Sequence, residues 1–565
     1  MPIAVPVRPP RPPKPLALSL KQRKTAAISA PTLPNASLAF IFRTATLVPP
    51  AVSSIDPSFQ ATQSRATILS LSHVNSQWRS ISLTIPELWH RLLLFDLDSD
   101  VNEVERPIYA RKPWLKELFR RSDPLPIDIG IAGYSYLPRD PVLVGLELEH
   151  LHRIRTYRAL LDERGWETLS SCLDEPAAVL QSLSLAFRPA MGRTSAFDQA
   201  PTPQLPRDLF NGHCPRLTKI SLRGCLPSQS DFSSAVRANL TSLTVSQVSG
   251  PGVPTADRWL AHLSGMRRLE HLLLEGGAIA GSSRPQKRNS QPRVASSEAV
   301  VLPSLRSLLL EGDVEAIGTL LHRLQPSVDA RISASCSGVR REGGIDHVLS
   351  TFGERMENAA MGIGAGPTVS FLAIKGGESK LEVSDGTHSH HLSLSFCRED
   401  TQAPTPTPTW ETVLSKFLGT VPFTIASLMA MEIQLPSAPP SLIRSLSGAC
   451  QLERLVNLNT TMLRQMLPPL QKYQMTMGMG SPSSPALPHR SLLSPLPVLP
   501  ALHTLHACSS DVFSGSSWAA LQGYLRWRAL GWRAVRVIQV PMAGGIEDEV
   551  VDVMRKLNIS FIYVE

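Results

Sequence analysis

Charged residues are scarce in this sequence, and acidic ones are missing altogether before Asp56. Asp, Glu, Lys and Arg make up 18% of the 565 residues, against a usual share of about 25%. The 56 basic and 47 acidic side chains leave a net charge of +9, which is too dilute over this length for the basic stripe of a nucleic-acid-binding protein. No apolar run approaches the roughly 18 residues that a membrane helix needs. The sequence therefore predicts neither nucleic acid nor membrane as a partner.

Cysteine pairs are also missing. The seven cysteines stand singly, without a CxxC pair, a pattern that fits reduced thiols of the cytosol or nucleus better than a disulfide framework. The first 30 residues are rich in proline and hold no apolar segment of the kind found in signal peptides. We therefore expect an intracellular, soluble protein that is cytoplasmic, nuclear or both.

Motifs of catalysis and nucleotide binding are absent as well. The sequence has no GxxxxGK[ST], HExxH or GxSxG pattern. The glycines over 362–366 form only a truncated pattern, which is more typical of a flexible turn than of a nucleotide-binding loop. We therefore expect no enzymatic activity and no cofactor.

One histidine cluster is a candidate metal site. His388, His390 and His391, with Cys397 nearby, are residue types that bind zinc. However, the alternating residues over 392–396 continue the cluster as a strand. That continuation favours a solvated edge between loop and strand, so we expect no metal.

Proline, by contrast, is abundant and divides the chain. The 49 prolines exceed the usual share of about 5% and exclude a single long helical bundle. Hydrophobic residues account for 42%, which is enough for a substantial core in several domains or in one long repeat array. Composition predicts a disordered, basic, proline-rich tail over 1–30 and a connecting segment over 96–150. Exposed loops are predicted near 189–206, 281–299, 402–409 and 475–500.

A repeated hydrophobic line runs through the C-terminal two-thirds of the chain. The pattern L-x-x-[LI]-x-[LVA] begins at Leu180, Leu217, Leu240, Leu269, Leu305 and Leu502, with a looser copy at Leu452. The last two apolar positions of each line alternate, so both face one side of a short strand. The leading leucine is expected to fill the core below the turn into that strand. Most copies start roughly 20–40 residues apart, a spacing that leucine-rich repeats adopt once loops are allowed.

Helical patterns lie between the lines, for example at Ala256–Ser264 and Val314–Leu324. A strand followed by a helix, repeated and unable to bury its apolar face alone, stacks into a solenoid. The sequence therefore predicts an irregular leucine-rich-repeat solenoid over 151–565. The alternative is a generic α/β protein with leucine-rich strands. The repeats cannot be phased through 330–450, so the solenoid is expected to be interrupted there.

The end of the sequence fits the same arrangement. Glu547–Leu557 is amphipathic, with acidic residues in its first turn and basic residues in its last, as the helix dipole favours. The following Ile559–Val564 is predicted to be a short strand. Together they would cap the array.

A different pattern precedes the repeats, over 31–95. Three- and four-residue steps place one set of apolar residues on a single predicted helix face: Ile68, Leu71, Val74, Trp78 and Ile81. Leu33 and Pro34 open an earlier predicted helix, whose apolar side is formed by Leu38, Ile41 and Phe42. Trp78 and Trp89 are expected to lie in the core of this unit. The pattern indicates a compact helical mini-domain that is too small for an enzyme cleft.

The motifs of this mini-domain resemble an F-box-like domain. They are Leu33-Pro34-x3-Leu38-x2-Ile41-Phe42, then Leu71-Ser-His-Val74-Asn75-Ser-Gln-Trp78-Arg-Ser-Ile81, then Pro86-Glu-Leu88-Trp89. These motifs are similar to those of F-box proteins abundant in mushroom-forming fungi, in which an F-box precedes irregular leucine-rich repeats. Trp114–Ile129 and Leu525–Val540 also resemble regions of those proteins. The resemblance implies an α/β fold: a small N-terminal helical F-box-like unit followed by an irregular leucine-rich-repeat solenoid.

The sequence departs from the family pattern in three places. The acidic residue usual after Leu-Pro is absent, Asn75 stands where a cysteine is common, and a loop over 43–67 is inserted between the first two helices. The insertion bears on how strongly the first helix would bind a partner.

The resemblance implies a substrate-recruiting subunit of an SCF-type cullin-RING ubiquitin ligase, active in ubiquitin-dependent degradation. Such a subunit performs no chemistry: its F-box binds a Skp-type adaptor, and through it the cullin and RING subunits, while its repeats bind an unidentified protein substrate. By this resemblance the adaptor-binding residues are Leu33, Pro34, Leu38, Ile41 and Phe42, with Val74, Trp78 and Leu88 supporting them.

Two points stay open at this level. The alternative function is a leucine-rich-repeat interaction scaffold without a ubiquitin ligase role, which the inserted loop favours. The residues that would contact a target are expected among the polar positions of the strands, such as Lys219, Ser221 and Arg223.

Overall fold

The computed structural model describes residues 33–46, 67–90, 108–130, 140–188, 202–281, 299–360, 371–396, 409–465 and 501–564, apart from short interruptions within these ranges. The predicted tail over 1–30, the glycine pattern at 362–366 and the predicted loops fall wholly or largely outside the described residues.

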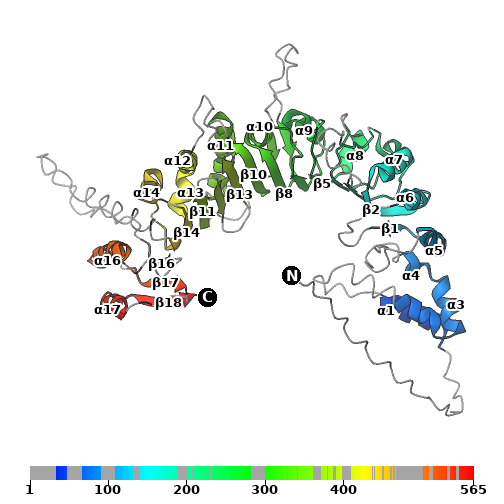
Figure 1. Cartoon of the computed structure of the whole chain (residues 1–565), viewed down its shortest axis with the longest axis horizontal. Coiled ribbons are helices and arrows are strands. Elements are labelled where there is room, and N and C mark those ends of the chain that lie inside the picture. The colour runs from blue at the N-terminus through cyan, green and yellow to red at the C-terminus, as the bar shows by residue number, and fades with distance from the viewer. Residues whose placement is uncertain are drawn as a thin grey trace, which may run out of the picture.

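One large, mostly parallel β-sheet dominates this mixed α/β chain. Its 16 strands form an arch, with helices along the outer side of the curve (Figure 1). From one edge, the first strands follow the order of the chain: β1 (Ile127–Ile129), β2 (Ile154–Leu161), β3 (Ser182–Phe187), β4 (Lys219–Arg223), β5 (Ser242–Ser246), β6 (His271–Leu274), β8 (Ser307–Asp313) and β10 (Arg331–Val339). The sheet continues through β13 (His390–Phe396), β12 (Lys380–Asp385), β11 (Phe371–Gly377), β14 (Ala430–Gln434), β15 (Arg454–Leu458), β16 (Thr504–Ala507), β17 (Val537–Pro541) and β18 (Ser560–Val564). A separate pair joins β7 (Val300–Leu302) and β9 (Leu324–Pro326).

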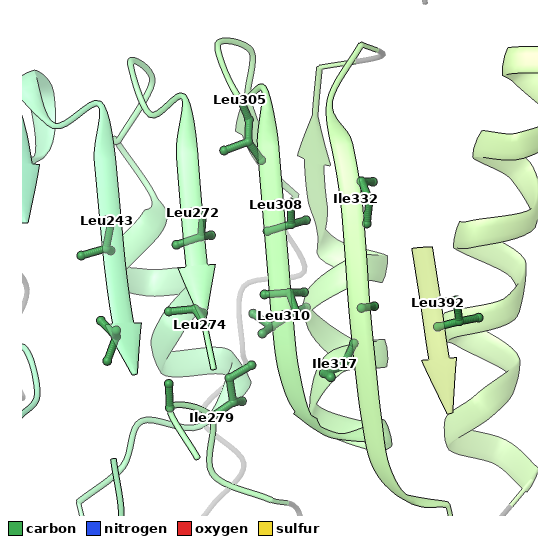
Figure 2. Packing of buried hydrophobic residues seen from close by; sticks show 14 of the residues in the cluster. Leu243, Leu272, Leu274, Ile279, Leu305, Leu308, Leu310, Ile317, Ile332 and Leu392 are labelled. Atoms are coloured by element: carbon green, nitrogen blue, oxygen red, sulfur yellow. The ribbon is translucent and has the colours of Figure 1, made fainter. Parts of the chain in front are cut away.

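The predicted repeat lines form neighbouring strands whose leucines align. One row crosses β3 to β8 in register, with every member at most 1% exposed: Leu183, Ile220, Leu243, Leu272 and Leu308. A second row lies two residues further along: Leu185, Leu222, Val245, Leu274 and Leu310. Figure 2 shows part of both rows. The leading leucines Leu180 and Leu305 are buried, as predicted. Because side chains alternate along a strand, these buried residues occupy one face of the sheet, and the outward positions of β4 and β5 on the other face are polar.

Helices cover the apolar face and lie beside one another. Those that accompany the sheet are α6 (Pro141–Leu148), α7 (Glu163–Cys172), α8 (Ser234–Asn239), α9 (Ala256–Leu263), α10 (Val314–Arg323), α11 (Glu342–Ala360), α12 (Trp410–Thr420), α13 (Pro422–Ser427), α14 (Pro440–Ser447), α16 (Gly515–Leu530) and α17 (Asp548–Lys556), with 3-10 turns at Leu151–Arg153 and Leu209–Gly212. Adjacent members are in contact, as α9 with α10, α10 with α11 and α11 with α12. The helices predicted at 256–264, 314–324 and 547–557 are confirmed as α9, α10 and α17, and the terminal strand is confirmed as β18.

The sheet changes character between β10 and β14. Here β12 is antiparallel to both β11 and β13, and the three strands stand in reverse chain order. At its two sides the meander rejoins the parallel sheet, through β13 with β10 and β11 with β14. An antiparallel meander has no strand–helix period, which is why the leucine spacing is lost within 330–450.

The N-terminal part of the described chain is a group of short helices. It comprises α1 (Asn35–Thr46), a helix over 67–73, α3 (Ser76–Thr84), α4 (Pro86–His90) and α5 (Ile108–Arg121). The single helix predicted from Ile68 to Ile81 is wrong, because the chain leaves the helix at Val74 and Asn75. Asn75 is extended, and its side chain accepts a hydrogen bond of 2.8 Å from the Trp78 amide. Asparagine is a strong helix N-cap, so this residue starts a second helix where the hydrophobic steps alone suggest continuation.

Candidate functional site

The residues predicted to contact an adaptor fall into a buried group and an exposed group. Leu38, Phe42 and Leu88 are each at most 1% exposed, and the Phe42 and Trp78 rings pack with centroids 5.0 Å apart. These four side chains hold the helices together. Their burial in this arrangement leaves Leu38, Phe42 and Leu88 almost no surface for direct contact with a partner.

In the exposed group, Ile41 lies on α1 and Leu33 and Pro34 directly precede that helix. Leu33 is 48% exposed, Ile41 42% and Val74 57%, and Pro34 is exposed as well. Val74 stands on the link before α3, and Gln77 of α3 donates hydrogen bonds to the Leu33 carbonyl and to the Asn35 side chain. The structure thus joins the beginning of α1 to the beginning of α3.

Phe40 is a surface residue that hydrophobic spacing along the sequence does not single out. Its side chain is 69% exposed. It lies two residues from both Leu38 and Phe42, and a step of about 100° per residue places it on the opposite side of α1. Leu33 and Pro34 directly precede α1, and Phe40 and Ile41 are neighbours within it. We name Leu33, Pro34, Phe40 and Ile41 the α1 apolar face.

The helical unit is joined to the sheet by a chain of packed side chains. The buried Trp89 donates from its indole nitrogen to the Ser82 carbonyl at 2.8 Å and packs edge-on against Trp114 of α5 at 6.4 Å. The Arg121 guanidinium lies 4.4 Å from the Trp89 ring centre, a cation–π distance. At the far end of α5, Arg153, which precedes β2, bonds back to α5 and its following turn. These contacts fix α4 and α5 on the edge of the sheet.

A second surface is the sheet face that the helices do not cover, which we name the inner face. In β4 the outward residues are Lys219, Ser221 and Arg223, the three expected to face a target, and both cations are exposed. The Arg223 guanidinium Nε donates to Gln247 Oε1 at 2.7 Å. Around β4 the inner face combines long cationic side chains with short hydroxyl side chains.

Farther along, the inner face carries mixed charges at the meander. Lys375 lies 3.4 Å from Glu432, and Lys380 lies 2.5 Å from Glu382. The hydrogen bond from Lys380 lowers the pKa of Glu382, burial opposes this, and the nearby charges of Lys380, His391 and Lys375 lower it further. Opposite charges are therefore already matched within this part of the face.

The candidate metal residues are not assembled into a site within the described part of the chain. His388 and Cys397 lie outside the described residues. His390 is 5% exposed and packs edge-on against Phe352 at 6.1 Å, so the prediction of a solvated edge is wrong for this residue. Among the residues that the structure describes, no three His, Cys, Asp or Glu side chains are placed to hold a metal ion.

The described buried cysteines have the properties of core residues. Burial raises the pKa of Cys214 to about 11 and that of Cys225 to about 12. Burial likewise raises the pKa of Cys336. Thiols held protonated in this way are poor nucleophiles and poor metal ligands.

Every helix in the described ranges is too short or too polar to cross a lipid bilayer.

No protein-family model matches this chain, and no curated protein matches it significantly.

Proposed function

We propose that this chain is the substrate-recruiting F-box subunit of an SCF-type cullin-RING ubiquitin ligase. In this proposal the helices over 33–90 are an F-box-like unit, and the sheet with its outer helices is an irregular leucine-rich-repeat array. The α1 apolar face would bind a Skp-type adaptor, which connects to the cullin and RING subunits. The inner face would bind the protein to be ubiquitinated.

The observation that carries the proposal is the α1 apolar face itself. Phe40 and Ile41 are exposed on a helix whose Leu38 and Phe42 are fully packed, and Leu33 is exposed just before that helix. Large exposed apolar side chains gathered on one helix face indicate a protein contact, and a helix face laid into an apolar groove is a common mode of recognition. The packed connection through Trp89 and Arg153 supports the same role, because it would hold a recruited target at a fixed distance from the adaptor.

The proposed contribution to ubiquitination is effective concentration. Holding a target next to a ubiquitin-loaded conjugating enzyme turns an encounter between two molecules into a step within one complex. In this role the chain needs no nucleophile, cofactor or metal of its own. Its contribution is to place two partners.

Co-purification of the full chain with a Skp-type adaptor tests this proposal. The informative variant is Phe40→Asp with Ile41→Asp, because both side chains are exposed and a carboxylate in an apolar groove is strongly disfavoured. Leu38→Asp is unsuitable, since Leu38 is 1% exposed and the change would unfold the helical unit. The matched control is Val142→Asp with Val301→Asp, two exposed valines away from α1.

Wild type and the valine variant are expected to retain the adaptor, and the Phe40/Ile41 variant to lose it. Circular dichroism and thermal unfolding must show all three proteins folded alike. Failure of the folded wild-type chain to bind would reject the ligase role. That result would favour the alternative, a leucine-rich-repeat interaction scaffold. The insertion predicted after the first helix favours it too, although the loop bounds 43–67 are wrong at both ends, because residues 43–46 belong to α1 and residue 67 to the next helix.

A further inference from the structure

The inner face over β2 to β5 has a defined arrangement of cations and hydroxyl groups. Register places Arg158 beside Ser184, and Ser184 beside Ser221. Lys219 and Arg223 flank Ser221 along β4. The full set of outward residues is Thr156, Arg158, Leu160, Ser182, Ser184, Ala186, Lys219, Ser221, Arg223, Ser242, Thr244 and Ser246. None of these twelve positions carries a carboxylate.

Two of the carboxylates that flank this region are engaged in ion pairs. On β1, Asp128 is paired with Arg155. Beyond β5, Glu270 lies 3.8 Å from Arg306. The positive charges of Lys219 and Arg223 therefore have no matching acid among the outward positions of the four strands. In this respect the region differs from the meander, where Lys375 and Lys380 are already matched.

The spacing of the cations fits an extended chain. Lys219 and Arg223 are four residues apart on one strand, which is about 13 Å at about 3.3 Å per residue. Two side chains four residues apart on an extended peptide have the same separation. Arg158 lies two strands from β4, about 10 Å away at about 4.8 Å per strand. One extended segment running along β4 can therefore meet both Lys219 and Arg223, with Arg158 at its flank.

The short side chains between the cations would allow a peptide to approach the sheet closely. Ser184 and Ser221 lie half-buried at the centre, so a peptide main chain can come close to the sheet there, and their hydroxyls can hydrogen-bond to it. The bond from Arg223 to Gln247 holds the guanidinium in place through Nε. That leaves its two terminal nitrogens to bind a carboxylate in the bidentate way that arginine favours.

We propose that the inner face over β2 to β5 binds an extended acidic segment of a partner protein. Carboxylates four residues apart would meet Lys219 and Arg223. This inference rests on the proposed function and deepens it, because it names the chemistry of the segment through which a target is recruited.

Fluorescence anisotropy with the full chain tests the inference. The probe is a labelled 12-residue peptide of alternating Glu and Ser, compared with one of alternating Gln and Ser. The Glu peptide is expected to bind at least tenfold more tightly, and its affinity to fall as salt is raised from 50 to 300 mM because added ions screen surface charges. Equal binding of the two peptides, or no binding of either, would overturn the inference.

Charge reversal separates this surface from the general positive charge of the chain. Lys219→Glu with Arg223→Glu is expected to weaken binding of the Glu peptide at least tenfold. The matched control is Arg164→Glu with Arg258→Glu, two exposed arginines of the outer helices α7 and α9, which changes the net charge by the same amount. The control is expected to bind within twofold of wild type. Equal loss in both variants would overturn the assignment of the surface.

Two further measurements show which part of the proposal a negative result would contradict. Binding of a phosphoserine peptide of the same length by a chain that ignores the Glu peptide would overturn the carboxylate assignment. Adaptor co-purification, which uses the α1 apolar face, is expected to survive Lys219→Glu with Arg223→Glu. A chain that binds the Glu peptide but no adaptor would refute the ligase role and leave the acidic-segment surface standing.

Discussion

The guanidinium of Arg153 donates hydrogen bonds of 2.9 and 3.1 Å to the main-chain carbonyl of Leu125. The same group reaches Ser122 Oγ at 3.1 Å and the Phe119 carbonyl at 3.3 Å, and forms a 3.0 Å ion pair with Asp123. A residue just before β2 thus satisfies the end of α5 and the turn after it. This side chain helps to hold α5 on the edge of the sheet.

Replacing Arg153 with Met should therefore loosen α5. The residue is 8% exposed, and its loss removes both side-chain donors from the part-buried Leu125 carbonyl and one from the Phe119 carbonyl, which we expect to cost about 2–4 kcal/mol of local stability. Hydrogen exchange of the amides over 108–130 measures the effect, with the amides over 371–396 as an internal reference. The control is Arg120→Met, an exposed residue of the same helix, which should exchange like wild type. Unchanged protection of α5 in Arg153→Met would contradict this account of the junction.

The start of α3 gives a second prediction. Asn75 accepts a hydrogen bond from the Trp78 amide, so Asn75→Ala removes an N-cap and is expected to destabilise the helical unit by about 1 kcal/mol. Asn75→Asp keeps an acceptor at the same place and should stay close to wild type. Thermal unfolding followed by Trp fluorescence compares the three proteins. An alanine variant as stable as wild type would show that α3 does not depend on its cap.

The strands of the sheet could be predicted from the sequence more completely than the N-terminal helices. The strands carrying Leu183, Leu243 and Leu308 could be placed because a two-residue period and a leading leucine recur with each strand, and register then follows from burying one face. Val74 was misplaced because hydrophobic spacing takes no account of a capping side chain one residue later. The outward side of Phe40 was hidden for a similar reason, since adjacent apolar residues on α1 serve opposite faces.

The remaining features depend on contacts distant in sequence. Arg153 meets residues about thirty positions earlier, and such a pairing leaves no local pattern. The meander of β11 to β13 breaks the repeat without breaking the sheet, so a search for strand–helix periods could only find a gap there. The surface over β2 to β5 could be found only from sequence and structure together. Lys219 and Arg223 are recognisable in the sequence as polar strand positions, but only the strand register shows that Arg158 lies two strands away.

A buried carboxylate supports the helices behind the meander. Glu357 of α11 is 8% exposed, and its Oε1 accepts a 3.0 Å hydrogen bond from the Thr424 amide in the first turn of α13. Glu357→Ala leaves that amide buried without an acceptor and opens a cavity, so we expect a loss of about 2–4 kcal/mol. Glu357→Gln retains an acceptor and nearly the same volume, and its loss should be much smaller. Urea unfolding distinguishes the variants, and equal losses for Ala and Gln would contradict the role of the acceptor.

Alanine substitutions at two glycines would distinguish the cost of a strained main-chain conformation from the cost of close packing. Gly265 (φ 93°) and Gly277 (φ 84°) both lie in the left-handed region. A Cβ at Gly265 would meet nothing within 4 Å, whereas a Cβ at Gly277 would lie 2.2 Å from the Val248 carbonyl oxygen of the neighbouring strand connection. Gly265→Ala should therefore cost only the conformational term, about 1–2 kcal/mol. Gly277→Ala should lower the stability by a further amount of about 1–3 kcal/mol, because main-chain atoms must move apart. Differential scanning calorimetry of the two variants measures the difference, and equal melting temperatures would mean that the turns after the strands are less closely packed than this geometry requires.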